Sequence, residues 1–246
     1  METRAERIAS GYRLTGRKAV VYNAPDADRL IVSARTAGSW RDERGLSLFL
    51  VPRRAESLHV SRFRTNDDHS AGDVVLDGVA VDGSALLGRE GEALELLDEA
   101  ADRASVALCA EALGAMDAIM TLCTEYLNTR VQFGRPIGKN QALQFRMVEM
   151  FYAREECRSL VSAALRVGEG DPASRRAAVS AAKVKVGESA RFLGQQGVQL
   201  HGAIGMTDEL PVGHYYKRLE SVRTLYGDPA HHLPRFGRWM EARNAP

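Results

Sequence analysis

The sequence predicts an α+β protein in which a partial antiparallel β-domain is followed by an up-down four-helix bundle. Up to about residue 87 the chain contains short β-branched runs separated by turn residues, a pattern typical of strands. From about residue 91 onward, apolar residues recur at steps of three and four, which is typical of helices. We therefore place a partial β-domain at 1–87 and a helical bundle at 88–246.

The first domain is expected to contain short strands bounded by Gly, Asn or Pro. The clearest β-branched runs lie at 11–16, 18–23, 30–34, 46–51, 74–76 and 79–81, the last two on either side of Asp77-Gly78. Asp-Gly between two apolar runs is a strong hairpin signal. This series of short runs predicts an antiparallel sandwich or barrel.

The second domain begins with an unusually long helical pattern. Apolar residues keep helical spacing from 94 to 126, roughly nine turns, and a helix of this length is typical of a bundle. Gly134, Pro136 and Gly138 then break the pattern. A second helix is expected over about 140–167.

Aspartate followed by proline marks two further helix starts, because aspartate caps a helix and proline fits its first turn. Asp171-Pro172 is expected to open the third helix, which Gly202 ends. A fourth helix should begin near Pro211, and Asp228-Pro229 should open a short last helix.

Composition excludes several classes of protein. There are 33 Lys and Arg against 32 Asp and Glu, so nothing favours nucleic acid or an anionic membrane. Cys109, Cys123 and Cys157 lie in apolar helical patterns without metal-ligand spacing, so neither a disulfide framework nor a metal site is expected. No apolar stretch is judged long enough to span a membrane, and no signal peptide is evident, so a cytoplasmic protein is expected.

Four segments resemble the acyl-CoA dehydrogenase family, in the family's order and at similar spacing. They are GYRLTGRKAVVYNAPDAD at 11–28, RVQFGRPI at 130–137 with Gln141 beyond it, VQLHGAIG at 198–205 and YKR at 216–218. The ending from 205 to 236 looks most like small subunits of the pimeloyl-CoA dehydrogenase type. The ordered set implies a fold of acyl-CoA dehydrogenase type.

The resemblance implies FAD as the cofactor, held between two subunits of a homo- or hetero-oligomer. Arg130 could pair with the pyrophosphate through two hydrogen bonds. The alternative is a surface arginine whose charge interacts favourably with the dipole at a helix C-terminus. Glycine in the turn at 199–205 lets the backbone approach a phosphate closely. The alternative role of this turn is to cap the C-terminus of the third helix. The implied cofactor-binding residues are Arg130, Gln132, Phe133, Gln141, Gln199, Gly202 and Ala203.

The chain also departs from the family. It is expected to lack the N-terminal helical domain. The usual catalytic glutamate is absent from both places that the family uses, 225–228 (LYGD) and 102–105 (DRAS). Asp228 is the nearest candidate base, with a helix N-cap as its alternative role. Asp102 and Ser105 fall in the segment on the substrate side, where Ser105 replaces the usual arginine.

Three functions remain open at this stage. The first is a flavin-dependent acyl-CoA dehydrogenase subunit that forms an α,β-unsaturated acyl-CoA and passes electrons to an acceptor flavoprotein. The second is a non-catalytic partner that completes the FAD site of a full-length sister chain. The third is a flavin monooxygenase on the same scaffold. We expect little activity and weak flavin retention from this chain alone.

Overall fold

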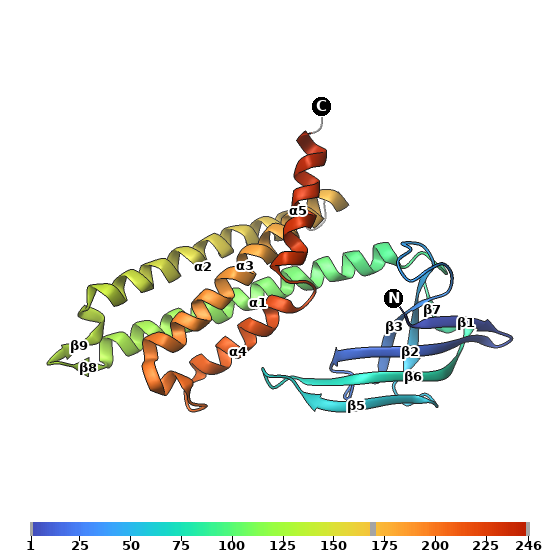
Figure 1. Ribbon diagram of the computed structural model, residues 1–246, viewed down its shortest axis with the longest axis horizontal. Helices are drawn as coiled ribbons and strands as arrows, with labels where there is room; N and C mark the ends of the chain where they lie inside the picture. Colours follow the sequence, from blue (N-terminus) through green and yellow to red (C-terminus); the bar gives the residue numbers. More distant parts are fainter. Residues whose placement is uncertain (1, 168–170, 245–246) are drawn as a thin grey trace. The chain divides into compact units, whose positions relative to one another are not determined.

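The computed structural model describes residues 2–167 and 171–244. The chain divides into two compact units, Met1–Glu99 and Ala100–Pro246. The first unit is built on a β-sheet and the second is helical (Figure 1). The predicted order of strands followed by helices is therefore confirmed.

The first unit contains a seven-stranded mixed sheet in its described residues, with the order β5-β6-β2-β1-β3-β4-β7. Neighbouring strands are antiparallel except β1 and β3, which pair in parallel. Residues that alternate along these strands form its core, in which the Tyr12 and Phe49 rings lie 4.9 Å apart. The strands are β1 Arg4–Ile8, β2 Gly11–Tyr22, β3 Arg29–Arg35, β4 Leu46–Pro52, β5 Leu58–Arg64, β6 Ser70–Asp82 and β7 Leu86–Leu87.

The interruption predicted at Asp77-Gly78 is wrong, because β6 runs through this dipeptide. Leu14 pairs with Val79 and Thr15 pairs with Asp77, so Gly78 is the extra residue of a β-bulge. Its φ of 73° suits glycine and explains how the strand continues without a turn. The break predicted between 16 and 18 is likewise absent, since β2 is continuous.

The described part of the second unit contains the expected helices. α1 begins inside the first unit and passes into the second. Asp171 caps α3 by accepting from the backbone N–H of Ala173 at 2.8 Å and of Ser174 at 3.3 Å. The last helix is longer than the short segment expected, because Pro234 is tolerated inside it. The helices are α1 Leu94–Thr129, α2 Gln141–Val167, α3 Pro172–His201, α4 Pro211–Thr224 and α5 Pro229–Asn244.

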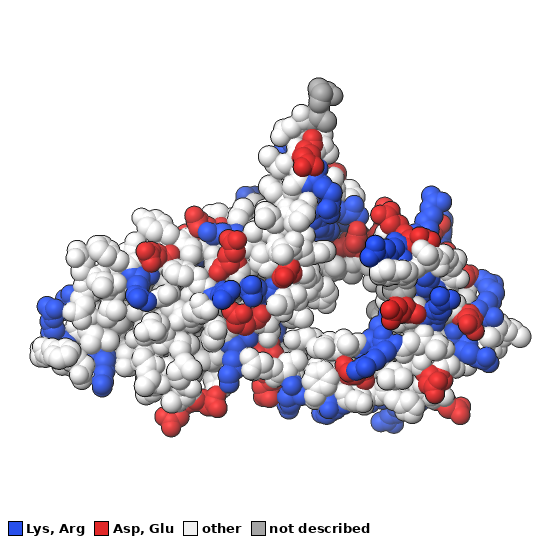
Figure 2. All heavy atoms as spheres, in the orientation of Figure 1, with Lys and Arg blue, Asp and Glu red and all other residues white. Residues whose placement is uncertain are grey.

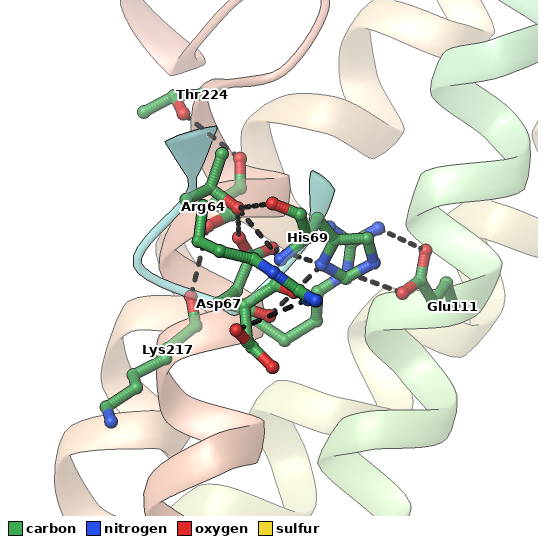
Figure 3. A network of polar contacts seen from close by, with 10 residues as sticks. Arg64, Asp67, His69, Glu111, Lys217 and Thr224 are labelled. Atoms are coloured by element: carbon green, nitrogen blue, oxygen red, sulfur yellow. Dashed lines mark hydrogen bonds and ion pairs between the residues drawn. The ribbon is translucent and has the colours of Figure 1, made fainter. Parts of the chain in front are cut away.

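Apolar faces of α1, α2, α3 and α4 form one buried core, including Met116, Met150 and Leu193. At the surface, Arg218 of α4 donates to the Glu111 carboxylate of α1 at 2.6 and 2.9 Å (Figure 3, at Glu111). Basic and acidic side chains are interspersed over the face drawn in Figure 2. This helical unit therefore combines an apolar interior with a surface of mixed charge.

One expectation about membranes needs correction. α1 is long and apolar enough, by length and composition alone, to cross a bilayer, with a mean hydropathy of 1.7 over its most apolar window. This is weak evidence, because the core helix of a globular bundle passes the same test. Cys109, Met116 and Ile119 of α1 lie in the core shared with the other helices, which accounts for its apolar composition.

Candidate functional site

The C-terminal ends of α1 and α3 lie beside the start of α2 at one end of the helical unit (Figure 1). The Tyr126 ring of α1 lies 4.7 Å from the His201 ring of α3. The N–H of Ile137 donates to the carbonyl of Arg130 at 2.9 Å, which brings the α1–α2 connection back against the end of α1. We call this region the hairpin end, after the small hairpin between α1 and α2.

The hairpin is formed by β8 Val131–Gln132 and β9 Arg135–Pro136. Phe133 and Gly134 form its two-residue loop with φ of 53° and 79°, and positive φ at both central residues defines a type I′ turn. Phenylalanine is unusual there, because a bulky residue is strained at positive φ. The Phe133 side chain is also fully exposed. A strained, exposed aromatic residue is a candidate for a functional role.

The other predicted cofactor residues lie at the same end. Gln141 opens α2 and Gln199 lies in the last turn of α3, and both are exposed. Gly202, at φ 67°, caps α3 by donating its N–H to the Gln199 carbonyl. Apart from its neighbours in the chain, no atom of the described residues lies within 4 Å of the position that a Cβ of Gly202 would occupy, so its backbone is open to approach. Ala203 follows it on the surface.

All seven predicted cofactor residues are therefore brought together, and most of their side chains are in solvent. The exposed Arg130 guanidinium and the N-terminus of α2 both favour an anion. The open backbone at Gly202 and the exposed Phe133 ring suit a phosphate-linked group with an aromatic base. The residues present thus fit the pyrophosphate and nucleotide portion of FAD.

Asp102 and Ser105 lie far from the hairpin end and are buried in the helical unit. The Asp102 carboxylate accepts from Arg235 of α5 at 2.7 Å and from Arg175 of α3 at 3.5 Å. A cavity of about 220 Å³ adjoins this triad, with Arg103 and Leu165 in its lining. Asp102 therefore joins three helices, and its predicted contact with substrate stays a prediction.

Asp228 is exposed at the start of α5, and its Oδ1 accepts from the backbone N–H of His231 at 2.9 Å. The N-cap alternative is thus confirmed. The preceding residues Tyr226 and Gly227 have φ of 55° and 102°, so the loop that carries Asp228 turns sharply. Capping uses one carboxylate oxygen in the described contacts, and a role as base stays a prediction.

A buried polar cluster beneath this loop was missed by the sequence analysis. Lys183 of α3 is fully buried, and its Nζ donates to the carbonyls of Val222 at 2.9 Å and Leu225 at 2.7 Å. Burial lowers the pKa of Lys183, while Cys109 and Asp228 act in the opposite direction. The signal was a lysine on the apolar face of a helix, four residues after Val179.

His232 completes the cluster. Its Nε2 lies 3.0 Å from the Tyr226 carbonyl and its Nδ1 lies 3.3 Å from Ser180 Oγ. Burial, the largest cause, lowers its pKa to about 4, so the ring is neutral at neutral pH. Since a carbonyl only accepts, Nε2 carries the proton and Nδ1 accepts from Ser180. The cluster thus fixes the backbone of the loop that presents Asp228.

Comparison with known proteins identifies the family. The model of the acyl-CoA dehydrogenase C-terminal domain matches residues 94–240, and that of the acyl-CoA dehydrogenase middle domain matches 1–79. The chain belongs to the acyl-CoA dehydrogenase family. The expected fold type and the family's cofactor, FAD, are thereby confirmed, and the ordered motifs of the sequence were a sound guide.

This acyl-CoA dehydrogenase homologue matches curated proteins that are longer than itself. It is 31% identical over 225 residues to a mitochondrial 2-methylacyl-CoA dehydrogenase of Solanum tuberosum, covering 87% of this chain and 52% of the relative. The chain thus spans about half the length of the curated relatives it matches.

Two solved structures share its fold. Butyryl-CoA dehydrogenase from Megasphaera elsdenii has a TM-score of 0.90 at 26% identity, over 97% of this chain and 63% of that one. A chain of the ChsE4–ChsE5 complex from Mycobacterium tuberculosis has a TM-score of 0.86 at 27% identity, over 99% and 63%.

Proposed function

We propose that this chain is a subunit of a flavin-dependent acyl-CoA dehydrogenase and acts only together with another chain. The reaction would convert an acyl-CoA thioester into its α,β-unsaturated form. FAD supplies the acceptor for the hydride that leaves the β carbon. Family membership and the set of residues at the hairpin end that fits FAD support this proposal.

The observation that carries the proposal is the separation of two groups of residues along α1. Asp102 lies near its start, and Arg130 directly follows its end at Thr129. At 1.5 Å per residue these positions are about 40 Å apart. Asp228 caps α5, and Arg235 of that helix binds Asp102. One cofactor would therefore meet the hairpin end of one chain and the Asp228 region of another.

Within such an assembly, this chain's own residues would perform two tasks. Arg130, Phe133 and the Gly202 backbone would hold the nucleotide portion of the cofactor. A carboxylate is needed to accept the proton α to the thioester, and Asp228 is the one that the loop presents. Lys183 and His232 would hold that loop by its carbonyl oxygens.

A second candidate function is a partner that supplies the hairpin end to a longer sister chain and no base of its own. Two observations favour it. Neither glutamate position of the family is occupied, and Asp228 already caps α5. The ChsE4–ChsE5 structure is a complex of two differently named chains, which offers a precedent for pairing with an unlike subunit.

A dye-reduction assay with several acyl-CoAs separates these functions. The purified chain, its Asp228→Asn variant and each with a full-length sister subunit are compared at matched flavin content. Asparagine is itself a good N-cap, so the variant should retain α5. We expect no turnover without the sister chain. Turnover with it that falls about 10²–10⁴-fold in Asp228→Asn would make Asp228 the base, and turnover indifferent to the substitution would favour the non-catalytic partner.

Flavin content provides the second measurement. A hetero-oligomer that retains FAD while each chain alone loses it supports the proposal. A homogeneous, fully flavinylated and active preparation of this chain alone would refute its dependence on a sister chain.

A further inference from the structure

The β-sheet unit carries a cavity of about 650 Å³ that the proposed function does not use. It is lined by residues of β2, β3 and β6. Val21 and Ile31 contribute apolar walls, and Arg29 contributes positive charge. The Arg17 guanidinium pairs with the Asp73 carboxylate. A cavity with apolar walls and cationic groups suits a ligand that has an apolar part and an anionic part.

One amine lies in this cavity. The Lys18 side chain is half-buried, and its Nζ donates to Ser33 Oγ at 3.3 Å. No carboxylate is among the described residues that line the cavity, and Asp73 of β6 is paired with Arg17. The other titratable groups of the lining are Arg17 and Tyr22 of β2 and Arg29 of β3. Burial without a compensating negative charge lowers the pKa of Lys18 to about 8.

We propose that Lys18 is a site of covalent acylation by acyl thioesters that enter this cavity. The choice of thioester rests on the proposed function, since an acyl-CoA combines an apolar acyl chain with anionic phosphates. The apolar walls would take the acyl chain, and Arg29 would attract the phosphates. The neutral amine, which is the nucleophilic form, is favoured by the same burial.

The reaction needs no further reagent. The Nζ lone pair attacks the thioester carbonyl carbon, a C–N bond forms, and the C–S bond breaks. The sulfur leaves with the electron pair of that bond. The proton that Nζ loses goes to the thiolate, so the products are an amide on Lys18 and free coenzyme A thiol. No atom is oxidised or reduced.

Two other lysines provide matched comparisons within the chain. Lys183 is also desolvated, but it is fully buried and donates to two carbonyls, so a thioester cannot reach it. Lys139 is exposed and is not among the residues that line the cavity around Lys18. Selective acylation of Lys18 over Lys183 and Lys139 would therefore show that the reaction needs a lysine that is both accessible and desolvated.

The test uses the full chain, without added flavin or partner, and butyryl-CoA as the probe. Acylation at each lysine is followed by peptide mass spectrometry, and released thiol is titrated in parallel. With a pKa of about 8, about one Lys18 amine in ten is neutral at pH 7. We expect Lys18 to be acylated at least about 10-fold faster than Lys139, with a rate that levels off above about pH 8–9.

Ile31→Glu provides a control, because Ile31 lines the cavity yet is 66% exposed, so the fold should tolerate the change. The added carboxylate should raise the pKa of Lys18 and slow its acylation at pH 7 several-fold. Equal rates at Lys18 and Lys139, or no effect of Ile31→Glu in a folded protein, would overturn the proposal. Because neither flavin nor a sister chain is present, such a failure leaves the proposed function untouched.

Discussion

Replacing Asp102 by alanine should strongly destabilise the helical unit. The Asp102 side chain is 2% exposed, and its partners Arg175 and Arg235 are 11% and 17% exposed. Removing the carboxylate would leave two largely buried guanidinium groups without this counter-charge. Breaking a buried ion pair costs about 3–5 kcal/mol, a large part of the 5–15 kcal/mol by which a domain is typically stable.

The same helix offers a matched control. Asp117 also lies between two arginines, Arg154 at 3.2 Å and Arg158 at 3.0 Å, but it is 41% exposed. When this carboxylate is removed, Arg154 keeps the Glu155 carboxylate at 2.7 Å and Arg158 is 45% exposed to water. Asp117→Ala should therefore cost no more than about 1 kcal/mol. Both variants remove one carboxylate of α1. They differ in the exposure of that carboxylate and in the Glu155 carboxylate that remains beside the arginines at Asp117.

Denaturant unfolding followed by circular dichroism at the helix band measures both changes. A triple variant, Asp102→Leu, Arg175→Met and Arg235→Met, separates charge from packing. If uncompensated charge causes the loss, this apolar replacement should recover most of it. Equal losses in Asp102→Ala and Asp117→Ala, or no recovery in the triple variant, would refute the reasoning.

Three further changes test the hairpin end and the cluster beneath the Asp228 loop. Arg130→Ala should weaken FAD binding to the assembled dimer by about 1.5–3 kcal/mol, as a hydrogen bond to a charged group requires; an unchanged Kd in flavin titration would remove Arg130 from the site. Phe133→Asn should raise or preserve the Tm of the isolated chain, since asparagine tolerates positive φ, yet reduce flavin retention. His232 has a folded pKa of about 4, below its ordinary 6.5, so the unfolded state binds the extra proton and stability should fall as pH drops from about 6.5 to 4. His232→Gln should remove that part of the acid loss in unfolding free energy measured against pH.

The local signals of the sequence were reliable guides to the helices. Asp171-Pro172 and Asp228-Pro229 both mark helix starts, because capping depends on a few adjacent residues. The same kind of signal failed at Asp77-Gly78, where Thr15 and Leu14 of a distant strand decide between a turn and a bulge. Pairing between strands is set by the partner, which local composition does not encode.

The candidate site likewise contains some residues that the sequence predicted and others that depend on distant parts of the chain. The residues of the hairpin end could be found because family motifs name them, and helix lengths then bring them to one end of the unit. The partners of Asp102 could not be found, since Arg175 and Arg235 follow it by 73 and 133 residues. Lys183 beneath the Asp228 loop depends in the same way on the carbonyls of Val222 in α4 and of Leu225 just after it.

The three buried cysteines give the helical unit a built-in measure of its own opening. Burial raises the pKa of Cys109 and Cys123 to about 12 and also raises that of Cys157, so the closed unit offers almost no reactive thiolate. A thiol reagent can react only when a helix separates transiently from its neighbours. Labelling rates at Cys109 and Cys123 of α1 and at Cys157 of α2 would therefore report the free energies of local opening, helix by helix.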